Sequence, residues 1–179
     1  MATMTRAKLN RIKSLIRDIP DFPRPGVLFR DITPLLGDVE GFADSIHLLA
    51  DRIAPYRPHA IVAVESRGFI FGSALALQTG LPLQLIRKQG KLPGKSVGIT
   101  YQLEYGTDRV EVHADAITPG QTYALVDDLI ATGGTAAAAA DLIQLQGGKI
   151  TCCAFVIELG FLNGRERLGA QPVESLIRY

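Results

Sequence analysis

Short apolar runs alternate with helical patterns along most of the chain. Strands are predicted at 60–64, 83–86, 109–113, 122–126, 150–158 and 173–177. The run at 109–113 alternates in the manner of an exposed hairpin strand. Helices are predicted at 41–55, 68–77 and 136–146. Because strands that alternate with helices favour a parallel sheet, the pattern predicts an α/β fold with a mostly parallel central sheet and helices on both faces.

The first 17 residues have the pattern of a basic amphipathic helix, with five Lys or Arg residues and no acid. Leu9, Ile12, Leu15, Ile16 and Ile19 recur at helical spacing. Mitochondrial presequences share this pattern with helices that pack on their own domain or on a partner subunit. Since no cleavage-like polar linker follows, we predict a packed helix and a cytoplasmic protein.

The composition fits a single domain over residues 1–179, because 47% apolar residues suffice for a full core. A net charge of +1 offers no basic surface for nucleic acid. The apolar runs are shorter than the roughly 20 residues that span a membrane. Cys152 and Cys153 are neighbours in a predicted strand, so we expect buried thiols on opposite faces. We therefore predict no nucleic-acid or membrane partner.

The segment after the strand at 122–126 carries the most informative chemistry. Asp127 and Asp128 follow the apolar run, and residues 132–135, Thr-Gly-Gly-Thr, open the next helix. Unpaired N–H groups at a helix start suit a phosphate, whereas the carboxylates would repel it and suit ribose hydroxyls. An ordinary joint with Thr132 or Thr135 as N-cap would account for the threonines. It would not account for two adjacent acids, which cost stability unless they bind something.

Basic residues follow two other predicted strands. Arg67 comes after the strand at 60–64, and Arg87, Lys88 and Lys91 come after the strand at 83–86. Ligands of a parallel sheet bind at the carboxyl ends of its strands, so these cations are expected to meet a polyanion such as a diphosphate. Each cluster taken alone is equally well explained as a solvated basic loop.

Residues 89–106 form a long polar segment with four glycines, which is typical of a mobile lid. A lid is useful where a reaction must exclude water. Glu104 is the carboxylate that such a lid would carry into the site, and an exposed acid without a role is the alternative reading.

Several segments together resemble the adenine phosphoribosyltransferases, a family of type I phosphoribosyltransferases. The matching segments are residues 21–34, 65–69, 86–94, 101–106 and 123–135. The last of these resembles the phosphoribosyl pyrophosphate signature shared by type I enzymes, whereas 21–34 and the lid are specific to the adenine family. The resemblance implies the type I phosphoribosyltransferase fold, a small hood that includes residues 1–34, and a flexible catalytic lid at 89–106.

The resemblance also implies a role for each candidate residue. The ribose 5-phosphate is assigned to Ala131, Thr132, Gly133, Gly134 and Thr135, and the ribose hydroxyls to Asp127 and Asp128. The pyrophosphate is assigned to Arg67, Arg87, Lys88, Lys91 and Tyr105, with a Mg2+ ion held mainly by phosphoribosyl pyrophosphate and water. No protein ligand to the metal is expected. Adenine is assigned to Phe29 and Leu159, with backbone groups near Leu28 and Arg30, and Glu104 to acid–base catalysis.

The implied reaction joins adenine and phosphoribosyl pyrophosphate to give AMP and pyrophosphate, a purine salvage step, in a homodimer. A phosphoribosyltransferase for hypoxanthine and guanine or for orotate is the nearest alternative, and segment 21–34 and Glu104 argue against it. A catalytically inactive regulator that senses phosphoribosyl pyrophosphate or purines should show a decayed lid and a DNA-binding patch. A plain nucleotide-binding module is the last alternative, and it would not require the lid at 89–106.

Overall fold

The computed structural model describes residues 2–102 and 106–179, and the chain divides into two compact units, residues 1–48 and residues 49–179. Helix α3 (Val39–Ile53) contains the point of division. The single domain expected for residues 1–179 stays a prediction.

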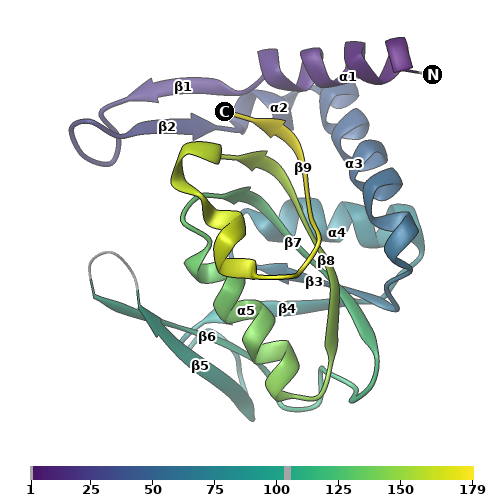
Figure 1. Cartoon of the computed structure of the whole chain (residues 1–179), viewed down its shortest axis with the longest axis vertical. Helices are drawn as coiled ribbons and strands as arrows, with labels where there is room; N and C mark the ends of the chain where they lie inside the picture. The colour runs from purple at the N-terminus through teal and green to yellow at the C-terminus, as the bar shows by residue number, and fades with distance from the viewer. Residues whose placement is uncertain (1, 103–105) are drawn as a thin grey trace. The chain divides into compact units, whose positions relative to one another are not determined.

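The N-terminal unit begins with helix α1 (Ala2–Ser14), which is followed by an antiparallel pair of strands, β1 (Arg17–Pro20) and β2 (Leu28–Asp31), and by the short helix α2 (Thr33–Gly37) (Figure 1). The predicted amphipathic helix is confirmed, but its extension to Ile19 is wrong. Ile19 lies in β1 and pairs with Phe29. Because the residue before a proline disfavours the helical conformation, Pro20 keeps Ile19 extended.

The second unit contains a seven-stranded sheet of order β5-β6-β4-β3-β7-β8-β9. Its strands are β3 (Ala60–Val64), β4 (Leu83–Lys88), β5 (Ser96–Gln102), β6 (Thr107–His113), β7 (Thr122–Ile130), β8 (Lys149–Glu158) and β9 (Val173–Arg178). Strands β4, β3, β7, β8 and β9 run parallel, while β5 and β6 join the edge antiparallel. The predicted α/β fold with a mostly parallel sheet is confirmed.

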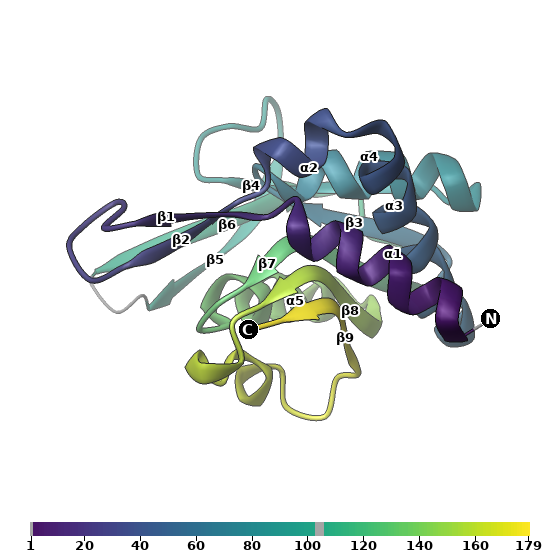
Figure 2. The same cartoon turned by 90° about the horizontal axis from the view of Figure 1, so that it is seen from above.

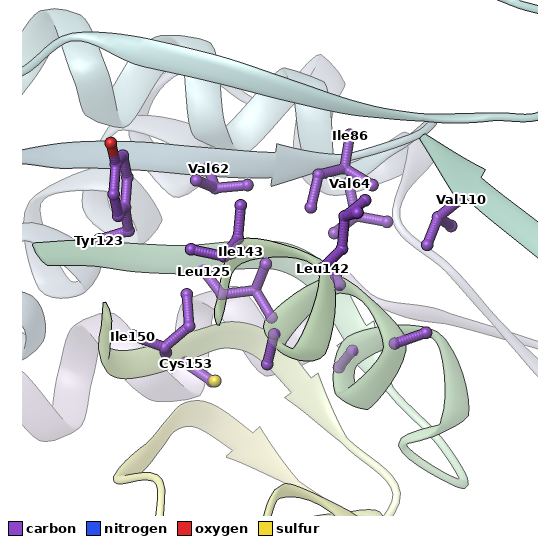
Figure 3. Packing of buried hydrophobic residues seen from close by; sticks show 14 of the residues in the cluster. Val62, Val64, Ile86, Val110, Tyr123, Leu125, Leu142, Ile143, Ile150 and Cys153 are labelled. Carbon is purple, nitrogen blue, oxygen red and sulfur yellow. The ribbon is translucent and has the colours of Figure 1, made fainter. Parts of the chain in front are cut away.

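Helices α4 (Gly68–Thr79) and α5 (Gly134–Leu145) cover opposite faces of this sheet (Figures 1 and 2). On the α4 face, a Cβ added to Gly72 would lie 2.4 Å from the Cβ of Ala63, so only glycine lets the helix approach this closely. Val62 and Val64 point to the other face, where they cluster with Leu142 and other residues of α5 (Figure 3). The alternation of side chains along β3 thus supplies both layers of the core. No described helix is long and apolar enough to cross a membrane.

Three strands differ from their predicted form because of the elements that pack against them. Strand β4 continues to Lys88 through its pairing with β6, so Arg87 and Lys88 lie within the strand and not after it. Strand β7 continues to Ile130, so Asp127 and Asp128 lie within the strand and not after it. Strand β6 was predicted to be exposed, yet Val110 and Val112 are buried, because they lie in the core cluster that includes residues of α5. Strand β5 occupies part of the segment predicted as a lid.

Cys152 and Cys153 are free thiols inside β8, as predicted. Burial raises the pKa of each thiol to about 12. Because the thiolate is the reactive form, we expect neither cysteine to react with Ellman's reagent in the native protein at pH 8. Both should react in denaturant, which serves as the control. Rapid modification of the native protein would contradict this burial.

Candidate active site

The candidate residues at the carboxyl ends of three neighbouring strands meet at one edge of the sheet. Strand β3 pairs with β4 on one side and with β7 on the other, with Val64 opposite Ile86 and Ala63 opposite Val126. This register places Arg67, the end of β4 and the acid pair at the carboxyl edge, where parallel sheets bind ligands. The strand pairing confirms the expectation that these groups share one edge of the sheet.

The acid pair is largely removed from water. Asp128 is buried and Asp127 half-buried, and the backbone N–H of Asp128 donates to Asp127 Oδ1 at 2.8 Å. Arg67 Nη2 lies 2.7 Å from Asp128 Oδ2. Burial, with the charge of Asp128 adding to it, raises the pKa of Asp127 well above its usual value. Burial also raises the pKa of Asp128, although Arg67 opposes the shift. Hydroxyl donors from a ribose would stabilise the ionised forms of both carboxyls.

The loop between β7 and α5 leaves its helix start open to a ligand. Gly133 is the N-cap of α5, with φ of 79°, and no side chain caps the helix. The alternative in which Thr132 or Thr135 is the N-cap is therefore wrong. A Cβ on Gly133 would lie 2.3 Å from the carbonyl oxygen of Gly164, so the loop packs closely against the 3-10 helix η3 (Gly164–Leu168). The first N–H groups of α5 lack partners within the helix and can bind an anion.

Three of the predicted cations are held by carboxylates at this edge. Arg67 pairs with Asp128, and Arg87 Nε lies 3.2 Å from Glu65 Oε2. Lys88 Nζ lies 2.6 Å from Asp108 Oδ2, and this hydrogen bond raises the pKa of the ammonium group.

The fourth predicted cation, Lys91, is exposed, and its carbonyl oxygen accepts a hydrogen bond from Arg87 Nη1 at 3.0 Å. The backbone of Lys91 therefore lies beside the Arg87 guanidinium.

Strand β5 adds contacts that the sequence-based reasoning missed. Tyr101 Oη lies 3.0 Å from Thr135 Oγ1 and 3.3 Å from Asp108 Oδ2. The alternation of Val97, Ile99 and Tyr101 was a usable signal, since it predicts a strand with these side chains on one face. It did not reveal which residues that face contacts.

Of the remaining candidates, three lie in the N-terminal unit, one lies in the second unit and two lie outside the described residues. Glu104 and Tyr105 lie outside the described residues. Phe29 lies in β2 of the N-terminal unit, where its ring meets Phe22 edge-on with centroids 5.1 Å apart. Its neighbours in the adenine assignment, Leu28 and Arg30, lie in the same strand. Leu159 follows β8 in the second unit, where its N–H donates to the carbonyl of Ile130 at 3.0 Å.

Comparison with known proteins adds an independent test. A model of the phosphoribosyl transferase domain family matches residues 30–169. An adenine phosphoribosyltransferase of Chloroflexus aurantiacus is 54% identical over 176 residues, which cover 98% of this chain and 100% of the relative.

Solved structures agree with this result. The crystal structure of adenine phosphoribosyltransferase from Rhodothermus marinus has a TM-score of 0.92 at 44% identity and covers 97% of this chain and 99% of its own. The Saccharomyces cerevisiae enzyme, complexed with D-2,5-dideoxy-2,5-imino-altritol 1,6-bisphosphate and adenine, has a TM-score of 0.90 at 38% identity, covering 96% and 99%. The matched residues include the acid pair and the loop before α5.

Proposed function

The chain belongs to the adenine phosphoribosyltransferase family, and from this premise we propose how its residues perform the transfer. The reaction moves the 5-phosphoribosyl group from phosphoribosyl pyrophosphate to N9 of adenine and gives AMP and pyrophosphate. The family predicted from the sequence is confirmed. The observation that carries the proposal for the individual residues is the meeting of the acid pair, the loop at 131–135 and the cations at one sheet edge.

The sugar phosphate is bound by the carboxyl end of β7 and the start of α5. Backbone N–H groups of residues 131–135 and the hydroxyls of Thr132 and Thr135 bind the 5-phosphate, with the helix dipole adding partial positive charge. The uncapped helix start at Gly133 supports this assignment. Asp127 and Asp128 accept hydrogen bonds from the ribose hydroxyls.

The pyrophosphate end is bound by Arg67, Arg87, Lys88 and Lys91, with Tyr105 helping to position it. During transfer the bond from C1 to the pyrophosphate oxygen breaks, and its electron pair leaves with the pyrophosphate. Negative charge therefore grows on the leaving group as the reaction proceeds. Cations that are already positioned stabilise this charge more in the transition state than in the substrate.

Magnesium fits this site as a partner of the substrate. Mg2+ prefers oxygen ligands and keeps several waters, so one or two carboxylates with substrate phosphates suffice to hold it. Among residues 2–102 and 106–179, no three His, Cys, Asp or Glu side chains are grouped to hold a metal ion. We assign the ion to oxygens of the pyrophosphate, ribose and water beside the acid pair. When bound, it would neutralise charge on the leaving pyrophosphate.

Adenine is assigned to Phe29 on one face and Leu159 on the other, with backbone groups near Leu28 and Arg30 reading its edge. N9 forms the new bond to C1 with inversion, and the base gives up one proton. Glu104 is proposed to handle the proton on the adenine nitrogens. The homodimer, the cytoplasmic location and the place in purine salvage stay predictions from the family resemblance.

The choice of base is tested by product formation. The protein is incubated with phosphoribosyl pyrophosphate, magnesium and either adenine, hypoxanthine, guanine or orotate, and the nucleotide is quantified by chromatography. Adenine is expected to give the highest kcat/KM. A higher value for one of the other three bases would assign the chain to that base instead.

A further inference from the structure

Four side chains connect the loop assigned to the 5-phosphate with a cation assigned to the pyrophosphate. Thr135 Oγ1 lies 3.0 Å from Tyr101 Oη, which lies 3.3 Å from Asp108 Oδ2. The same oxygen of Asp108 accepts a hydrogen bond from Lys88 Nζ at 2.6 Å. These residues, Thr135, Tyr101, Asp108 and Lys88, are called the relay below. Thr135 and Lys88 lie at its ends.

The sheet fixes the position of each member of the relay. Tyr101 and Asp108 are direct partners in the antiparallel pair of β5 and β6. Strand β6 pairs in turn with β4, where Lys88 lies opposite Val110. Helix α5, which carries Thr135, packs against β5 (Figures 1 and 2). The contacts therefore rest on regular secondary structure.

The number of available protons fixes the direction of the hydrogen bonds. The hydrogen bond from Lys88 holds the pKa of Asp108 below its usual value, so this carboxylate is ionised at neutral pH and only accepts. Tyr101 has a single hydroxyl proton and donates it to Asp108. Thr135 must then donate its own proton to Tyr101, because Tyr101 has none left to give.

Binding at either end changes this arrangement. A 5-phosphate that takes the proton of Thr135 leaves Tyr101 to donate to Thr135 Oγ1, so Asp108 keeps Lys88 as its remaining side-chain donor in the relay. Asp108 then holds Lys88 more firmly, so Lys88 is less available to bind a pyrophosphate. A pyrophosphate that binds Lys88 removes that donor from Asp108, which then depends on the proton of Tyr101. Thr135 continues to donate to Tyr101 and is less available to bind a 5-phosphate. Such a coupling is reciprocal by thermodynamic necessity.

On the basis of the proposed function, we propose that Tyr101 is a positioning residue that makes the binding of a 5-phosphate and of a pyrophosphate mutually antagonistic. After transfer, AMP and pyrophosphate occupy the two ends as separate molecules. The relay lets each product weaken the other, which favours release of the first product. Tyr101 itself does not touch the reacting atoms in this scheme.

The test measures the dissociation constant of magnesium pyrophosphate by calorimetry, with and without saturating ribose 5-phosphate. Ribose 5-phosphate fills the phosphate end but cannot react, since it carries neither base nor pyrophosphate. In the wild-type protein it should raise the Kd of pyrophosphate by a factor that includes direct repulsion between the anions. In Tyr101→Phe this factor should be about threefold to tenfold smaller, because one hydrogen bond no longer links the ends.

Tyr56→Phe is the matched control. Tyr56 also donates its hydroxyl to a carboxylate, Glu174 at 2.7 Å, but it precedes β3 at the opposite edge of the sheet. In Tyr56→Phe, ribose 5-phosphate should raise the Kd of pyrophosphate by the same factor as in the wild type. If Tyr101→Phe does not fold, Asp108→Asn tests the relay at the next inner member and should also reduce the factor.

An unchanged factor in a folded Tyr101→Phe or Asp108→Asn variant would overturn the inference. A reduction of the same size in Tyr56→Phe would also overturn it. Failure of the proposed function is a separate result, since it would appear as no AMP formation by the wild-type protein.

Discussion

Replacing Glu104 by Gln is expected to lower kcat about 100- to 10,000-fold while changing the Kd of adenine and of phosphoribosyl pyrophosphate far less. The amide keeps the shape of the side chain but can no longer accept and return a proton. An interaction used in the chemical step lowers kcat and kcat/KM together, whereas a binding role raises KM. Steady-state kinetics combined with calorimetric binding of each substrate separates the two cases.

Asp141→Asn is the control for the loss of a carboxylate. Asp141 is exposed on α5, and we assign it no contact with substrate. Its kcat should stay at the wild-type value. Equal losses of turnover and substrate binding in Glu104→Gln would contradict the assignment of Glu104 to chemistry. Glu104 lies outside the described residues, so this experiment is the direct test of its role.

Gly133→Ala is expected to lower kcat/KM for phosphoribosyl pyrophosphate about 100-fold, the usual result of a displacement of about 1 Å in a binding group. Two independent causes act at this position. The φ of 79° costs an alanine about 1–2 kcal/mol. In addition, its Cβ would lie 2.3 Å from the carbonyl oxygen of Gly164, so the loop or η3 must move. Either movement displaces the N–H groups assigned to the 5-phosphate.

Gly120→Ala separates the backbone penalty from the damage to the loop. Gly120 has a similar φ of 83°, but a Cβ there would meet nothing within 4 Å. This variant should lose stability in urea unfolding and keep its kcat/KM. The account of the loop would be contradicted if Gly133→Ala kept wild-type kcat/KM, or if Gly120→Ala lost as much activity.

The parts of the fold that sequence reasoning predicted are those with local causes. The buried run of β3, the helix α4 after it and the apolar start of β7 each follow from side chains close together in the chain. The errors have distant causes. Val110 is buried because α5 packs against β6. Strand β7 continues through Asp127 because β8 pairs with β7 as far as Ile130.

The same distinction holds in the candidate site. Arg67 and the acid pair were predicted to lie at the same edge because all parallel strands present their carboxyl ends there. Their ion pair was not predicted. The relay was not predicted, since Tyr101 meets Asp108 through the register of β5 with β6 and meets Thr135 across a separation of 34 residues. The register of β5 with β6 cannot be predicted from a local sequence pattern. The close approach of Gly133 to Gly164 was not predicted either, because the two residues are far apart in the sequence.

We expect this chain to turn over adenine and phosphoribosyl pyrophosphate and not merely to bind them. The most direct test follows AMP and pyrophosphate together after mixing the purified protein with both substrates and magnesium. The two products should appear in equal amounts and in many-fold excess over the protein. Binding of phosphoribosyl pyrophosphate without formation of AMP would contradict it, and would instead support a regulator that senses this ligand.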